Sequence, residues 1–272
     1  MFGFLKKRRR DRIRNRAFPV TWRDLLVSRY PLYSRLSPLD RQELQGHLQV
    51  FLAEKRFEGC GGQEITDEVR VLIAAQACLL LLHRDTDGYP LLHSILVYPS
   101  SYVAKTWHRE NDGTITEDFQ ARGGESWPHG TVVLAWDGAF AGAVELNQGR
   151  NLVLHEFAHQ LDEEDGVADG APLLSGSNLW QARHHYQTWA RVLSEEFQQL
   201  RRAVEDGQET VLDTYGAKNP AEFFAVATET FFEKPGRLQE RHPALYAQLK
   251  AFYQQDPLLY ALAIPGKNEI SI

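Results

Sequence analysis

The sequence predicts an α+β protein that is predominantly helical and carries a small sheet. Three long stretches have the composition or apolar spacing of helices, at residues 22–57, 64–82 and 179–205. Shorter runs rich in β-forming residues lie between them, within residues 91–107 and 131–136. At 272 residues the chain is long enough to bury a large core, in one domain or in two closely packed ones.

Composition excludes several other classes of protein. Apolar residues make up 43% of the chain and charged residues 24%, which is ordinary for a globular protein. A net charge of −6 gives no general indication of direct nucleic-acid binding. The two cysteines, Cys60 and Cys78, lack metal-binding spacing, so we expect both to be reduced, as in the cytoplasm.

The first 18 residues differ from the rest of the chain because they are strongly basic. Five consecutive cations at 6–10 are followed by Arg12, Arg14 and Arg16. We expect a solvated tail; the alternative is a contact arm for an acidic partner or an anionic membrane surface, helped by Phe2, Phe4 and Leu5. Residues 19–272 are predicted to form the folded domain, with room for a helical N-terminal subdomain to about residue 85.

The elements follow in order along the chain. Pro31 and Pro38 break the first helical stretch, and the helix at 64–82 is expected to pack against a later helix at 150–162. Strands at 91–98 and 101–107 precede a polar loop and the strand at 131–136. After a Gly/Asp-rich loop at 163–177, helices are expected at 179–205 and 235–263. The longest apolar run, 71–82, is too short to cross a bilayer, so no transmembrane segment is predicted.

The helix at 150–162 contains the pattern H-E-x-x-H, formed by His155, Glu156 and His159. Residues four apart share one face of a helix, so both imidazoles can bind one ion, and neutral imidazole is a good zinc ligand. Glu156 is then carried to where it can act as a general base. The alternative is an amphipathic helix with ordinary histidines; the apolar flanks indicate burial, where unpartnered polar groups are costly, and so favour a metal.

A catalytic zinc usually takes a third protein ligand. Asp162 lies near His159 on the same helix, but it could equally orient a histidine. The better candidate is Glu222, in the first turn of a helix that Asn219-Pro220 is expected to start. Glu222 could also close a capping box on Asn219, and the spacing alone does not separate these two interpretations.

Several motifs together carry a family resemblance. His155–Asp162, Tyr215-Gly216 and Ala221–Ala225 resemble the catalytic core of the anthrax lethal factor metalloprotease. The chain resembles the bacterial Mlc titration factor A family more closely. That likeness extends to Phe57–Cys60, Trp136–Gly138 and the loop at 165–170, and covers most of the chain.

The resemblance implies a zincin-like metallopeptidase fold, with a small sheet above the histidine helix. It also implies a gluzincin-type zinc peptidase with one Zn²⁺ per chain, held by His155, His159 and Glu222, and with Glu156 as catalytic base. Tyr215 matches a tyrosine beside the substrate carbonyl, where a phenol can donate to an oxyanion; the alternative is a buried aromatic bonded to a nearby carbonyl.

Two classes of function stay open. The resemblance implies an aminopeptidase acting on small peptide substrates that also binds the glucose repressor Mlc, and so modulates the glucose phosphotransferase system. The alternative is a regulatory protein without catalysis, which sequesters a repressor and keeps a structural or vestigial metal site. Glu156 favours the enzyme, because a purely structural site has no use for a base at that position.

A substrate also needs a surface along which to lie. In zincin-like folds an edge strand pairs with the extended substrate, and the strand at 131–136 is placed to do so. The alternative is a core strand with both edges paired, and the sequence does not choose between them.

Overall fold

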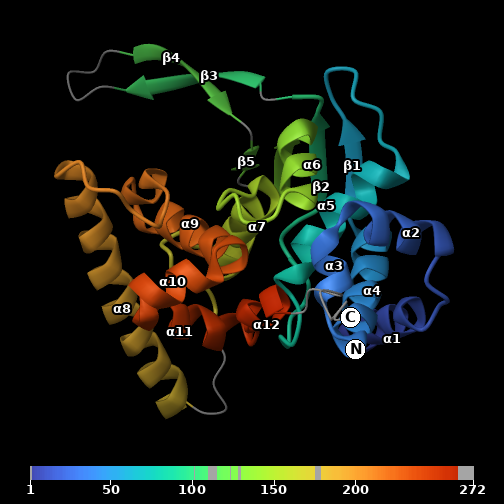
Figure 1. The fold of residues 1–272 in the computed structure, drawn as a ribbon. Helices are drawn as coiled ribbons and strands as arrows, with labels where there is room; N and C mark the ends of the chain where they lie inside the picture. The colour runs from blue at the N-terminus through green and yellow to red at the C-terminus, as the bar shows by residue number, and fades with distance from the viewer. Residues whose placement is uncertain are drawn as a thin grey trace, which may run out of the picture.

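The computed structural model describes residues 2–100, 102–109, 115–122, 124–127, 130–174 and 179–262 (Figure 1). The expected class, a mostly helical α+β fold with a small sheet, is confirmed. The helices of the first half are α1 (Phe2–Arg14), α2 (Val20–Arg29), α3 (Pro31–Arg35), α4 (Pro38–Glu54) and α5 (Asp67–Leu79). Those of the second half are α6 (Trp136–Val144), α7 (Leu152–Asp162), α8 (Leu179–Glu205), α9 (Pro220–Glu233), α10 (Pro235–Arg241), α11 (Pro243–Tyr253) and α12 (Pro257–Leu262).

The main sheet has four strands in the order β1-β2-β6-β5. Its strands are β1 (Arg56–Gly59), β2 (Ser94–Tyr98), β5 (Gly124–Trp127) and β6 (Thr131–Ala135). Strands β1, β2 and β6 run parallel, with Ile95 of β2 opposite both Phe57 and Val132. Strand β5 pairs antiparallel with β6. Strand β6 is therefore a core strand with both edges paired, and the edge beside it is β5.

Strands β3 (Tyr102–Arg109) and β4 (Ile115–Arg122) form a separate antiparallel hairpin. The strand expected at 101–107 is thus present, but β4 and β5 lie where the sequence predicts a polar loop. That prediction was wrong because polar residues form a strand readily when a partner supplies the backbone hydrogen bonds, and pairing of this kind is not visible in hydrophobic periodicity.

One apolar core joins the two helical halves of the molecule. Helix α5 is buried along most of its length and contacts α2, α4, α6 and α7, as expected for the helix near the histidines. Phe157 of α7 packs against Phe51 of α4 and Tyr89, with ring centroids 5.8 and 4.9 Å apart. Packing on several sides therefore holds helix α7 in place independently of any ligand.

Proline and its neighbours set the breaks of the N-terminal half. Pro31 and Pro38 open α3 and α4 at the first helical position, where a missing N–H costs nothing. Ser37 caps α4 by accepting the Asp40 N–H at 3.1 Å.

Cys60 and Cys78 are both free. No helix among the described residues is long and apolar enough to span a bilayer.

The basic N-terminal segment was expected to be a solvated tail, yet residues 2–14 form helix α1, which contacts α4. Ile13 is buried, and the Arg10 guanidinium is buried against Glu54, to which Nη2 donates at 2.6 Å. A buried, paired arginine fixes the helix on the body, and the sequence pattern of cations alone does not reveal it. The division into residues 1–18 and 19–272 stays a prediction.

Candidate metal centre

Helices α7 and α9 pack side by side and carry the site between them. Helix α7 begins where the Asn151 side chain accepts the Leu154 N–H at 3.0 Å. Helix α9 begins in the same way, since Asn219 accepts the Glu222 N–H at 2.9 Å and Pro220 occupies the first position. The two caps fix where the first turn of each helix lies, and therefore where its side chains point.

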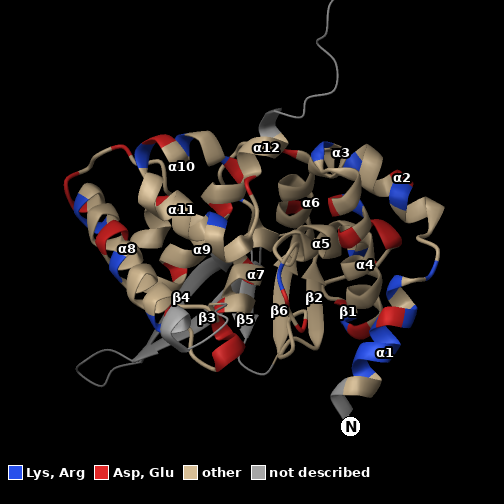
Figure 2. Cartoon of the chain, turned by 90° about the horizontal axis from the view of Figure 1, so that it is seen from below, with Lys and Arg blue, Asp and Glu red and all other residues tan. Residues whose placement is uncertain are grey.

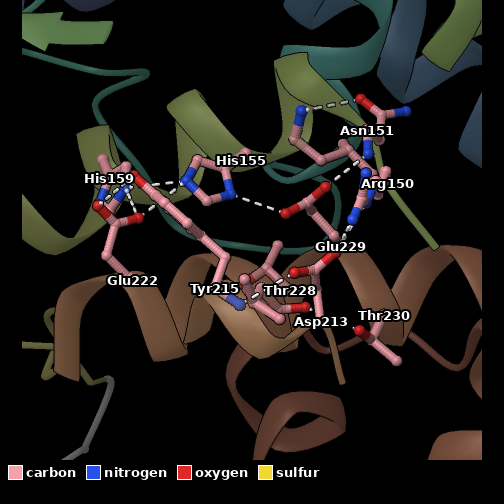
Figure 3. A network of polar contacts seen from close by, with 12 residues as sticks. Arg150, Asn151, His155, His159, Asp213, Tyr215, Glu222, Thr228, Glu229 and Thr230 are labelled. Carbon is pink, nitrogen blue, oxygen red and sulfur yellow. Dashed lines mark hydrogen bonds and ion pairs between the residues drawn. The ribbon is translucent and has the colours of Figure 1, made fainter. Parts of the chain in front are cut away.

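Three ligand atoms from these helices converge on one point (Figure 3). His155 Nε2 lies 3.1 Å from Glu222 Oε2, and His159 Nε2 lies 3.3 Å from each of those two atoms. All three side chains are only 13 to 14% exposed. The two predicted histidines and the downstream glutamate are thus brought together, as one of two groups in the described part of the chain that could hold a metal ion.

The spacing of these atoms fits a zinc ion. Ligand atoms about 2.0 to 2.1 Å from a tetrahedral zinc lie about 3.3 to 3.4 Å from one another, close to the three separations found here. Two imidazoles and one carboxylate are also the donor types that zinc takes in catalytic sites. The residues present therefore fit the metal that the sequence predicted.

Asp162 does not join this group. Its Oδ2 accepts the Gly170 N–H at 2.8 Å, and its side chain is fully buried. Gly170 has φ +78, and a Cβ there would meet Pro220 O at 2.6 Å, so only glycine allows this close approach. Asp162 thus holds the loop after α7 against the start of α9, and burial raises its pKa to about 6.

Glu229 is the site residue that the sequence analysis missed. Its Oε1 lies 2.7 Å from His155 Nδ1, and its Oε2 accepts the Asn151 N–H at 2.6 Å. A carboxylate at Nδ1 keeps the proton on that nitrogen and leaves Nε2 free to bind a metal. Glu229 lies two turns after Glu222 on the same face of α9, and an acidic residue at that spacing in an otherwise apolar helix was the available signal.

The site concentrates negative charge in a buried place. Burial alone would lower the pKa of His155, but hydrogen bonding to Glu222 and Glu229 outweighs it and raises the pKa to about 10. Burial alone would raise the pKa of Glu222, but the two facing imidazoles hold it far below its ordinary value. Burial raises the pKa of Glu156 to about 7. The carboxylates around His155 thus favour a positive charge at this point, which a divalent cation can also supply.

Tyr215 stands at the open side of the site, in the 3₁₀ helix η2 (Thr214–Ala217). Its side chain is 50% exposed, so the alternative of a buried aromatic is wrong. Tyr215 Oη donates to Glu222 Oε1 at 3.2 Å, and Lys218 Nζ donates to Tyr215 Oη at 3.3 Å. Asp213 holds η2 by accepting the Tyr215 N–H at 2.9 Å. A phenol O–H thus reaches the same carboxylate as the two histidines.

Comparison with known proteins identifies the family of the chain. Residues 5–254 match the family described as glucose-regulated metallo-peptidase M90, and the chain belongs to that metallopeptidase family. A protein named Mlc titration factor A from Klebsiella pneumoniae is 32% identical over 243 residues, 88% of this chain and 87% of that protein. One of the same name from Pectobacterium atrosepticum is 32% identical over 230 residues, 84% of each chain. An uncharacterized protein of Synechocystis sp. is 43% identical over 253 residues, 92% of this chain and 90% of that protein. The family resemblance drawn from the motifs is confirmed.

Proposed function

We propose that this chain is a zinc-dependent peptidase of the gluzincin type, with a zincin-like fold and one Zn²⁺ per chain. The observation that carries the proposal is the convergence of His155 Nε2, His159 Nε2 and Glu222 Oε2 within 3.1 to 3.3 Å of one another. Those three side chains would hold the ion. When bound, zinc polarises a carbonyl oxygen and lowers the pKa of water.

The protein's own residues supply the proton transfers. Glu156 follows His155 on α7 and is only 5% exposed, so its carboxylate is shielded from bulk solvent. It would accept the proton of the attacking water and deliver it to the leaving amine. Tyr215 is exposed enough to meet a substrate and would donate its O–H to the developing oxyanion. Glu229 would hold the His155 ring in its ligating orientation throughout.

Substrate and partner are narrower proposals. The family resemblance supports an aminopeptidase acting on small peptides in the cytoplasm. The name Mlc titration factor A, carried by relatives that align along most of the chain, supports binding of an Mlc-type repressor as a second activity. Repressor binding needs a surface rather than a base, so it should not depend on Glu156.

The decisive test compares wild type with Glu156→Gln. We expect both to retain one zinc, while turnover on a broad panel of peptides and amino-acid anilides falls by about 10² to 10⁴ in the variant. Glu240→Gln, an exposed acid-to-amide change on α10, is the matched control and should keep full turnover. Unchanged turnover in Glu156→Gln would overturn the assignment of the base.

The same preparations test the partner. Purified Mlc should bind wild type and Glu156→Gln with equal affinity in a direct binding assay. Zinc without turnover in wild type, together with tight repressor binding, would instead support the alternative of a regulatory protein without catalysis.

A further inference from the structure

Helix α1 carries a charge that the rest of the chain does not share. Residues 6–14 of this helix contain seven Lys and Arg side chains and a single acidic one, Asp11, although the whole chain has a net charge of −6. Figure 2 shows α1 at the edge of the molecule, with its N-terminal end pointing away from the body. None of the residues proposed for catalysis lies on this helix, so its composition is unexplained by the peptidase site.

One face of α1 packs against the rest of the protein. Arg10 and Ile13 are buried, and Arg10 bonds to Glu54 and Asp87. Lys6, one turn before Arg10, donates to Asp87 at 2.6 Å. These contacts fix how the helix is rotated about its axis, and therefore which side chains are turned outward.

The opposite face combines apolar and basic side chains. Phe4 and Leu5 are 65 and 57% exposed, and Arg8 and Arg12 are exposed as well. Phe4, Arg8 and Arg12 follow one another at intervals of four, so they lie along one stripe of the helix. The Arg8 guanidinium lies 5.1 Å from the centre of the Phe4 ring, which joins the apolar and basic parts of this stripe.

We propose that this outward face of α1 docks the protein on an anionic lipid surface. Clustered cations bind the negative headgroups of such a surface, and apolar side chains beside them enter the boundary between headgroups and acyl chains. A nucleic-acid duplex would be matched by the cations but offers nothing to Phe4 and Leu5 on its phosphate backbone. The apolar end at the outer tip of the helix therefore favours a lipid surface over a nucleic-acid duplex.

Vesicle co-sedimentation of the full chain tests the proposal. Wild type should bind vesicles of equal parts phosphatidylcholine and phosphatidylserine, should not bind pure phosphatidylcholine, and should be released by salt, because exposed charges are screened. Arg8→Glu with Arg12→Glu should weaken binding by at least about tenfold. Phe4→Ser with Leu5→Ser should also weaken it, without a change in charge.

Matched controls separate binding from folding. Arg201→Glu with Arg202→Glu changes the net charge equally on exposed positions of α8 and should leave vesicle binding within about twofold of wild type. Thermal unfolding of every variant should show a folded protein. Absence of wild-type binding to the anionic vesicles would overturn the proposal. So would tighter binding of a random-sequence DNA duplex at the same salt, or retention of vesicle binding by the Phe4 and Leu5 variant.

Discussion

Two clusters of histidine and carboxylate side chains can be compared within this molecule. In the first, His155, His159 and Glu222 present three atoms to one point. In the second, Asp40 lies 3.0 Å from Nε2 of His83, while Glu43 lies 3.5 Å from Nδ1 of the same ring. The residue types are similar, but in the second cluster the two carboxylates lie at opposite nitrogens of a single imidazole.

This difference in geometry distinguishes the proposed metal centre from the second cluster. The three atoms of the first cluster lie 3.1 to 3.3 Å from one another, whereas in the second the two carboxylates face different nitrogens of one ring. His83 is also 37% exposed, against 13 to 14% for the two histidines of α7. Exposed ion pairs contribute little to stability. The charges of the first, largely buried cluster need opposite charges or hydrogen bonds to offset their loss of hydration. By residue type and proximity alone, both clusters would count equally as candidate metal sites.

The largest expected effect comes from Glu222→Ala. This change removes one of the three proposed ligands, and the only anionic one among them, so we expect zinc affinity to fall by more than about a hundredfold and turnover to fall with it. Competition with a chromogenic chelator measures the affinity. Unchanged zinc affinity in this variant would contradict the ligand set and return Asp162 to consideration.

Tyr215→Phe should leave zinc in place but slow the reaction. Loss of one donor to an oxyanion costs about 10² to 10³ in kcat, and we expect the lower end because the metal acts on the same oxygen. Zinc content and kcat should be measured on one preparation. A variant that keeps wild-type kcat would show that the phenol serves only to hold Glu222.

Glu229→Gln should have an intermediate effect on the first cluster. The amide keeps an acceptor for the Asn151 N–H but removes the charge that faces His155 Nδ1. Changes of this kind cost about 10- to 100-fold in metal affinity or activity. Chelator competition and turnover, run beside Glu240→Gln, should show the loss. An effect below about twofold would mean that Glu229 only caps the start of α7.

The smallest effect is expected in the second cluster, from Glu43→Gln. The pKa of Glu43 is lowered, first by a hydrogen bond to the His47 side chain. The backbone N–H of His83 and the charges of both imidazole rings lower it further. A lowered folded-state pKa means that the ionised form stabilises the protein above the unfolded pKa, and that this stability is lost as acid protonates the group. We expect about 0.5 to 1 kcal/mol of destabilisation near neutral pH, shrinking below about pH 4, with zinc content unchanged. Urea unfolding at several pH values measures it; a constant difference would exclude a charge effect.

Local features of the site could be predicted from the sequence. The spacing of His155 and His159 is a property of one helix, and Asn219-Pro220 starts α9 as expected. For Glu222 the open choice was between a cap and a ligand. The structure shows the Asn219 side chain capping the Glu222 N–H, while the Glu222 carboxylate turns toward the imidazoles. Its backbone takes part in the cap, and its side chain is free for the site.

What could not be predicted depends on contacts between distant segments. Glu229 reaches His155 only because α7 and α9 pack together. Its position in an apolar helix does not indicate which residue it would contact. The pairing of β6 on both edges depends on β5, whose residues show no strand periodicity. The burial of Arg10 in α1 requires Glu54 and Asp87, both more than 40 residues away.

Zinc stoichiometry of three proteins shows which of the two clusters holds the metal. Wild type, His159→Ala and His83→Ala would be dialysed against buffered zinc and their bound metal counted. We expect one zinc per chain in wild type and in His83→Ala, and none at the same free zinc in His159→Ala. Zinc retained by His159→Ala and lost by His83→Ala would contradict this expectation, because the metal would then belong to the exposed cluster.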